Sequence, residues 1–215
     1  MIRIYPPDGL VKVSAPLRLS DRRIRQQLQE KSGWIRAQRE RIQQQPLSVE
    51  EPLQSGTSIV YQGKNYLVLV TEHHGPSQLK INGTLLHCYI KENTSDSEKN
   101  ALLERWYRRQ MESLLPELIV HWSAIIGVEV KEWGIKKMKT RWGSCNTRAH
   151  RIWLNLNLIK KPQICLEYVL VHELVHLLEA SHNQRFYQLM TQFMPRWREY
   201  QKVLEGHQTI NECAD

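Results

Sequence analysis

Long apolar runs are missing from this sequence of 215 residues. The best candidate, residues 114–130, is interrupted by Pro116, Glu117, His121 and Glu129, so no segment reaches the ~20 apolar residues of a membrane span. We therefore expect no membrane-spanning helix. The first ten residues also lack an apolar run, and we expect no secretory signal there.

Cysteine is scarce, and the residues that occur show no paired spacing. They are Cys88, Cys145, Cys165 and Cys213. This pattern predicts reduced thiols in a cytoplasmic protein rather than a disulfide framework. With 41% hydrophobic and 24% charged residues and no fixed-period repeat, the sequence is not that of a collagenous, coiled-coil or wholly disordered chain.

Positive charge is in excess, because 30 Lys and Arg outnumber 22 Asp and Glu and give a formal net charge of +8. Much of it lies in a predicted helix within residues 18–41, where Ser20 suits the N-cap and Gly33 a break. Its basic residues are Arg22, Arg23, Arg25, Lys31, Arg36, Arg39 and Arg41. They form either a solvated helix face or a surface for nucleic-acid phosphates, so nucleic acid is one candidate partner.

The first 92 residues favour short strands around this basic helix. We expect strands at 2–5, 10–13, 58–61, 66–71, 78–81 and 84–90. Asn82-Gly83 is a strong signal for a hairpin turn, and the polar run 93–99 marks the best internal boundary. We therefore expect an N-terminal lobe at 1–92, a core at 93–206 and a frayed tail at 207–215.

The expected core mixes helices and strands. We expect helices over 98–126, 184–193 and 196–204, and strands over 128–133 and 151–158. Pro116 should divide the first of these helices. After Pro162 the chain is apolar on nearly every side of a helix, which is typical of a buried helix. Together these elements predict an α+β fold with a small mixed sheet beside a buried helix.

The buried helix contains the sequence His172-Glu173-Leu174-Val175-His176. Residues four apart share a helix face, so both imidazoles can bind one Zn²⁺ ion, and Glu173 can reach a water on it. Zinc lowers the pKa of its water from about 15.7 to roughly 7. Glu173 would take up the proton as general base and return it to the leaving amine as general acid. This is the chemistry of a zinc metallopeptidase.

Two core histidines satisfied by their neighbours are the alternative to a metal site. Burying two imidazoles and a carboxylate in so apolar a helix is costly unless something pairs with them, so we favour one Zn²⁺ ion. A catalytic zinc needs a third protein ligand. We favour His182 over Glu199, which is more simply a partner of Arg196 or Lys202. Glu179 suits a helix, so we expect the chain to leave the helix near residue 180.

The His-Glu motif is flanked by further recognisable sequence segments. Thr140-Arg141-Trp142-Gly143-Ser144-Cys145 and Ile152-Trp153-Leu154-Asn155-Leu156-Asn157 precede the His-Glu motif, and Phe186 follows it. In combination they closely resemble the YgjP-like metallopeptidases, which are related to the WLM and SprT-like zinc peptidases. The resemblance covers about residues 20–204. It implies a minimal zincin-like core, His182 as the third ligand, and a peptide or protein substrate.

Several neighbours of the motif are candidates for substrate binding. Arg141 would bind a carboxylate or an oxyanion and Trp142 would wall a pocket, although a structural turn explains both equally well. In zincins the strand before the active helix often pairs with the substrate, so we expect a peptide along 151–158 with Asn155 at its rim.

The sequence does not assign a role to three further residues. Tyr187 and His150 are candidate donors to the transition state, and the sequence does not choose between them. Cys145 is more simply a small core residue than a nucleophile.

Two other functions compete with a simple peptidase. The basic helix and the relation to SprT-like and WLM proteins suggest a nucleic-acid-associated protease that acts on DNA- or RNA-bound proteins. A non-catalytic zinc module is the second, although a structural site would usually recruit a fourth Cys or His.

Overall fold

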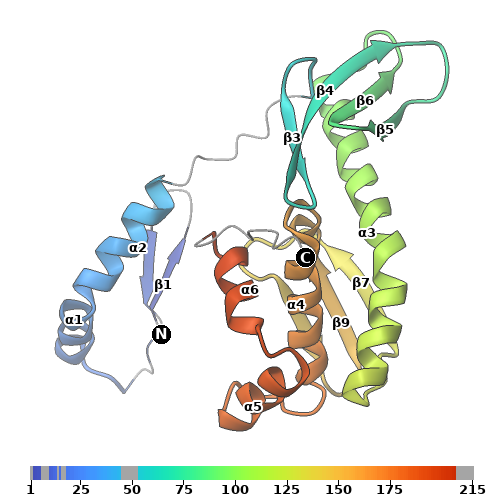
Figure 1. Cartoon of the computed structure of the whole chain (residues 1–215). Helices are drawn as coiled ribbons and strands as arrows, with labels where there is room; N and C mark the ends of the chain where they lie inside the picture. The colour runs from blue at the N-terminus through green and yellow to red at the C-terminus, as the bar shows by residue number, and fades with distance from the viewer. Residues whose placement is uncertain (1, 6–9, 14, 16–17, 45–52, 207–215) are drawn as a thin grey trace. The chain divides into compact units, whose positions relative to one another are not determined.

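The computed structural model of the protein describes residues 2–5, 10–13, 15, 18–44 and 53–206 (Figure 1). The chain divides into two compact units, Met1–Glu51 and Pro52–Asp215. The expected lobe boundary near residue 92 thus falls inside the second unit. The expected tail at 207–215 lies outside the described residues.

The first unit contains a hairpin and two helices. β1 (Ile2–Tyr5) pairs antiparallel with β2 (Leu10–Val13), as predicted, and α1 (Asp21–Glu30) and α2 (Ser32–Gln44) follow. The break between the helices lies at Lys31, two residues before the predicted position at Gly33. Ser20 is the N-cap of α1, although its side chain makes no capping hydrogen bond.

The second unit begins with a four-stranded mixed sheet. Its strands are β3 (Ser58–Tyr61), β4 (Lys64–Glu72), β5 (Gln78–Asn82) and β6 (Leu85–Ile90), in the spatial order β3-β4-β6-β5. β4 and β6 run parallel, and the other two pairs are antiparallel. Gly83, with φ of 57°, lies in the predicted Asn82-Gly83 turn between β5 and β6.

A long helix, α3 (Asp96–Ile126), follows this sheet (Figure 1). It begins with a capping box, in which Ser95 Oγ accepts from the Glu98 amide while the Glu98 carboxylate accepts from the Ser95 amide. It ends at Gly127, whose φ of 77° is left-handed.

The prediction that Pro116 divides this helix is wrong, because α3 is continuous through it. Pro116 lies on the exposed side, where it removes one backbone hydrogen bond. Its neighbours Leu115 and Ile119 are buried and hold the helix against the core. The packing of the buried face of α3 therefore stabilises the helix by more than the missing backbone hydrogen bond at Pro116 destabilises it.

A three-stranded sheet and four helical segments complete the second unit. The strands are β7 (Glu132–Lys136), β8 (Gly143–Asn146) and β9 (Arg151–Asn155), in the order β7-β9-β8. The helical segments are η1 (Leu156–Lys160), α4 (Gln163–Val175), α5 (Gln184–Phe193) and α6 (Trp197–Leu204). α4 packs on β8 and β9, and α3, α5 and α6 contact it. The predicted α+β fold, with a small mixed sheet beside a buried helix, is confirmed.

The structure corrects the expectations for the strand at 151–158. β9 ends at Asn155, and residues 156–160 form a 3₁₀ helix. β9 pairs in parallel with β7 and antiparallel with β8, so it is central and offers no free edge to a peptide. The expectation of a peptide along β9 is therefore wrong. β8 has no counterpart among the predicted strands, because Gly-Ser-Cys-Asn has little β propensity.

α4 is buried on nearly all sides, as its apolar sequence predicts. Leu166, Leu170, Val171 and Leu174 are at most 1% exposed. Its apolar surface is thus covered by protein. Among the helices of the described residues, none combines the length and the apolar character that a bilayer crossing requires.

Asn155 joins β9 to the segment that precedes β8. Its Nδ2 donates to the carbonyls of Met138 (2.9 Å) and Arg141 (2.7 Å), and its Oδ1 accepts from the amide of Asn157 (3.1 Å). Its side chain is 3% exposed. The placing of Asn155 at an exposed rim that contacts substrate is therefore wrong, since all its polar atoms are engaged inside the protein.

We expect Asn155→Ala to lower the free energy of unfolding by about 2–4 kcal/mol, because four hydrogen bonds of this buried side chain are lost. Asn157→Ala is the matched control, since its backbone amide rather than its side chain bonds Asn155, and it should change stability by less than about 0.5 kcal/mol. Urea denaturation measures both, and equal losses would contradict this role of Asn155.

Candidate metal centre

The two histidines of the motif lie at the C-terminal end of α4. α4 ends at Val175 with His176 as its C-cap, about four residues earlier than predicted. Glu179, which was expected to continue the helix, lies outside it and stabilises the turn instead. Its carboxylate accepts from the amide of Ser181 (3.1 Å), and its carbonyl accepts from Nδ1–H of His176 (3.1 Å). This early turn returns the chain toward the helix end.

Three imidazoles meet where the chain turns back. Nε2 of His172 and Nε2 of His182 are 3.0 Å apart, and one ring nitrogen each of His172, His176 and His182 lies within 4.8 Å of the other two. Since Nδ1 of His176 donates to a carbonyl, its Nε2 is left with a lone pair for a ligand. The three residues proposed as metal ligands are thus brought together.

Phe186 covers one side of this arrangement. Its ring centroid is 4.9 Å from that of His172, 4.6 Å from His176 and 4.7 Å from His182, and it is fully buried. The N-cap of α5 fixes its position, because Asn183 Oδ1 accepts from the amide of Phe186 (3.0 Å). The aromatic ring therefore packs against all three imidazoles at once.

The electrostatics of the cluster favour neutral imidazoles at His172 and His176. Burial, with smaller contributions from His176 and His182, lowers the pKa of His172 to about 3. Burial also lowers the pKa of His176. Neutral imidazoles are the form that binds metal. Tetrahedral zinc with Zn–N bonds of about 2.05 Å separates ligand nitrogens by roughly 3.3 Å, which is close to the 3.0 Å between Nε2 of His172 and Nε2 of His182.

Glu199, the alternative ligand, does not lie with this cluster. It is exposed on α6 and accepts from Arg196 Nε (3.0 Å) and Nη2 (2.8 Å). Among the described residues, the group of His172, His176 and His182 is the only one with metal-binding geometry. His73, next to His74, accepts at its Nδ1 from the amide of Gly75 (3.1 Å) and belongs to no such group.

Glu173 lies beside the ligands but is 94% shielded from solvent, since its exposed fraction is 6%. Burial raises the pKa of its carboxyl to about 8, and the nearby Arg141 opposes this rise. The thiol of Cys145 is close to Glu173. Burial is the larger cause, and the charge of Glu173 the smaller one, that raise the pKa of this thiol to about 11. Cys145 is thus a protonated thiol, consistent with a small packing residue.

The other flanking residues differ in accessibility. Arg141 is exposed, and Trp142 is half-buried with Lys161 Nζ 5.9 Å from its ring centroid. Their carbonyls accept from Asn155, which fixes the backbone of both. Direct substrate contact by Arg141 and Trp142 stays a prediction.

The two candidate donors differ in position. Tyr187 is 40% exposed, and its ring centroid is 6.5 Å from that of His182. His150 lies in the connection between β8 and β9, where its Nδ1–H donates to the carbonyl of Glu129 (2.9 Å). The structure therefore brings Tyr187 next to His182, whereas His150 is bonded to the carbonyl of Glu129.

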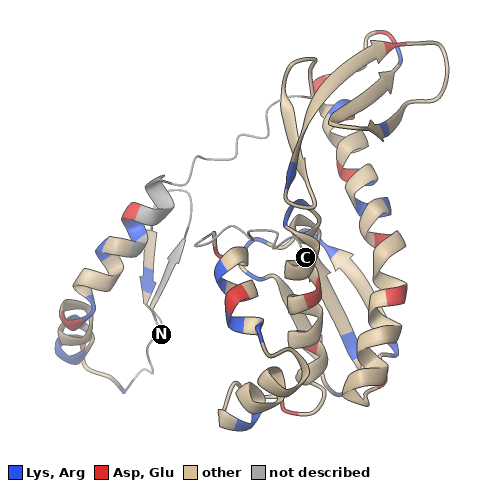
Figure 2. Cartoon of the chain, viewed as in Figure 1, with Lys and Arg blue, Asp and Glu red and all other residues tan. Residues whose placement is uncertain are grey.

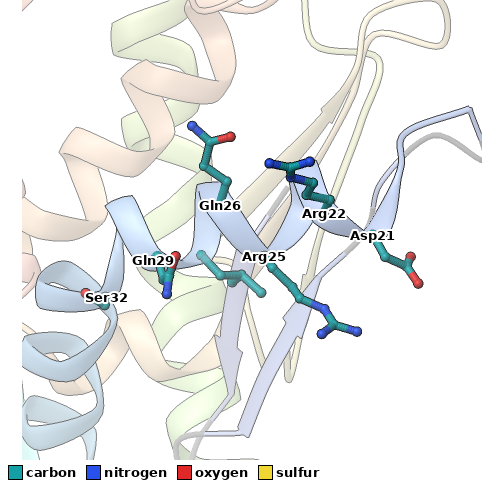
Figure 3. A pocket seen from close by; sticks show the side chains of 7 residues that line it. Asp21, Arg22, Arg25, Gln26, Gln29 and Ser32 are labelled. Atoms are coloured by element: carbon teal, nitrogen blue, oxygen red, sulfur yellow. The ribbon is translucent and has the colours of Figure 1, made fainter.

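The basic helices present a separate surface. Arg22 and Arg25 of α1 line a pocket together with Gln26 and Leu28 (Figure 3). Lys and Arg residues also occur along α3 and α6 (Figure 2), so positive charge is not confined to α1 and α2. Nucleic-acid binding through residues 18–41 stays a prediction.

We expect Phe186→Leu to lower zinc affinity about tenfold to hundredfold, because the ring that packs against the three imidazoles is lost. Phe193→Leu, at the other phenylalanine of the chain, is the control and should leave the affinity unchanged. Competition with a chromophoric chelator measures both. Equal affinity in the two variants would contradict this role of Phe186.

One comparison with known proteins matches nearly the whole chain. The sequence model of the family described as "YgjP-like, metallopeptidase domain" matches residues 1–207. No curated protein matches the chain. Among solved structures, the metallopeptidase zymogen of Pyrococcus abyssi abylysin is 20% identical, with a TM-score of 0.41. That match covers 43% of this chain and 93% of the other, and a likeness this weak supports no conclusion about this chain.

Proposed function

Since this chain belongs to the YgjP-like metallopeptidase family, we propose that it is a zinc-dependent peptidase in which His172, His176 and His182 hold one zinc ion. The convergence of three imidazole nitrogens within 4.8 Å supports this proposal most strongly. When bound, zinc supplies a Lewis acid that makes water a nucleophile at neutral pH.

Glu173 is proposed to handle the protons of the reaction. It follows His172 directly in α4, and its burial keeps bulk water away from the carboxylate. It would accept the proton of the attacking water and deliver it to the amide nitrogen as the C–N bond breaks. Arg141, whose charge acts on Glu173, would favour the ionised carboxylate and so oppose part of the effect of burial.

The substrate is proposed to bind along β8. β8 is an edge strand of its sheet, whereas β9 is paired on both sides. α4, which carries Glu173, packs on β8. An extended peptide that pairs with the free edge of Gly143–Asn146 would lie next to the metal ligands. Arg141 and Trp142, which lead into this strand, remain candidates for contact with the same peptide.

Tyr187 is proposed to stabilise the developing oxyanion by donating its hydroxyl proton in a hydrogen bond. Its ring stacks on Trp197, with centroids 5.6 Å apart and planes at 14°. Thr191 Oγ1 donates to the Tyr187 carbonyl (2.9 Å) and accepts from Trp197 Nε1 (3.1 Å). Ring and backbone are thus held from two sides, which supports a fixed donor beside His182.

The two competing functions receive less support. A structural zinc site usually closes with four protein ligands, and among the described residues only three converge. The proposal that the protein acts on nucleic-acid-bound proteins is supported by exposed arginines such as Arg22 and Arg23. A helix face that contacts only water also carries such residues, so they do not favour this function. A cytoplasmic location stays a prediction from the cysteines, of which Cys88, Cys145 and Cys165 are free thiols.

We expect Glu173→Gln to retain one zinc ion per chain but to lower kcat on a quenched peptide library at least a hundredfold, because the group that moves the proton is lost. His182→Ala should instead lose zinc along with activity. Metal analysis and the peptidase assay separate the two effects. Full hydrolysis by the Glu173→Gln variant would end the assignment of Glu173.

We expect Tyr187→Phe to lower kcat about tenfold to a thousandfold with KM and zinc content unchanged, because only the hydroxyl is removed. His150→Gln is the control and should keep full activity, since His150 lies in the β8–β9 connection. A Tyr187→Phe enzyme as active as the His150→Gln enzyme would exclude Tyr187 as the donor.

A further inference from the structure

Gly143 lies at the start of β8, against the side chain of Glu173. A Cβ atom at this position would lie 2.6 Å from Oε1, 2.8 Å from Cγ and 3.0 Å from Cδ of Glu173. Carbon atoms in contact are ordinarily about 3.5–4.0 Å apart. Any side chain at position 143 would therefore overlap the outer half of Glu173.

Backbone conformation does not account for glycine at this position. Five glycines of the described residues have positive φ, and Gly143 is not one of them. Its pairing with Leu154 of β9 places it in an ordinary antiparallel ladder, which other residues can adopt. The obstacle to a side chain at position 143 is thus Glu173 itself.

Glu173 has little room to move away. It is 6% exposed, and it lies on α4, whose neighbouring residues Leu174 and Val175 are fully buried. Cys145, two residues along β8 and on the same face as Gly143, is also packed against the core. The wall formed by Gly143 and Cys145 therefore limits where the carboxylate can lie.

We propose that Gly143 is a positioning residue, whose missing side chain lets the β8 backbone lie against Glu173 and fixes the carboxylate beside the metal ligands. This inference rests on the proposed function, and it explains why glycine occurs in the sequence Arg141-Trp142-Gly143. It also gives β8 two roles, since one face would position Glu173 while the free edge pairs with the substrate.

The test begins with Gly143→Ala. All three nearest atoms to the added Cβ belong to Glu173, so the imidazoles are not disturbed and zinc content should stay at one ion per chain. We expect kcat on the quenched peptide library to fall at least tenfold, because a carboxylate displaced by about 1 Å loses its catalytic geometry. KM should change less than about threefold.

Gly134→Ala is the matched control for crowding alone. A Cβ at Gly134, in β7 of the same sheet, would lie 2.2 Å from Cζ3 of Trp153 and does not involve Glu173. We expect this variant to lose thermal stability while its folded, zinc-loaded fraction keeps the kcat of the original protein. If both variants lose kcat equally, or neither does, Gly143 is not a positioning residue.

A stability comparison tests the contact without any activity measurement. With Glu173 present, Gly143→Ala should lower the thermal midpoint, whereas in the Glu173→Ala background it should leave the midpoint unchanged or raise it, since alanine suits a strand better than glycine. Equal losses in both backgrounds would overturn the inference. A protein without peptidase activity would count against the proposed function, while this comparison would still decide whether Glu173 and Gly143 interact.

Discussion

Three imidazoles that face one another at the end of an apolar helix are the interaction on which the rest of this structure depends. Nε2 of His172 and Nε2 of His182 are 3.0 Å apart, and one ring nitrogen of His176 lies within 4.8 Å of a nitrogen of each, so the divalent ion that we propose here would satisfy all three rings. Neighbouring residues hold the three rings in place. Phe186 packs against each ring, and Glu179 fixes the orientation of His176.

Part of this site could be predicted from local spacing alone. His172 and His176 share a helix face because they are four residues apart, and the apolar residues around them indicate burial. The path of the chain to His182 could not be predicted. Glu179 favours a helix by propensity, yet its hydrogen bonds to His176 and Ser181 belong to a turn. The helix propensity of one residue contributes little free energy, and the two hydrogen bonds of Glu179 in the turn contribute more.

In the fold, too, features that depend on residues near in sequence could be predicted, and features that depend on distant residues could not. Hairpins joined by short turns and helices with clear caps were predictable, because residues near in sequence determine them. The order β7-β9-β8 depends on pairing between distant segments, and no local pattern indicates it. Asn155 illustrates the consequence, since an asparagine on an expected outer face is the buried junction between β9 and the segment before β8.

X-ray absorption spectroscopy of the zinc-loaded protein measures which atoms surround the ion. We expect a four-coordinate ion with three imidazole nitrogens and one light atom from solvent at about 2.0–2.1 Å. A sulfur ligand from Cys145, a fourth protein ligand, or fewer than three imidazoles would contradict it.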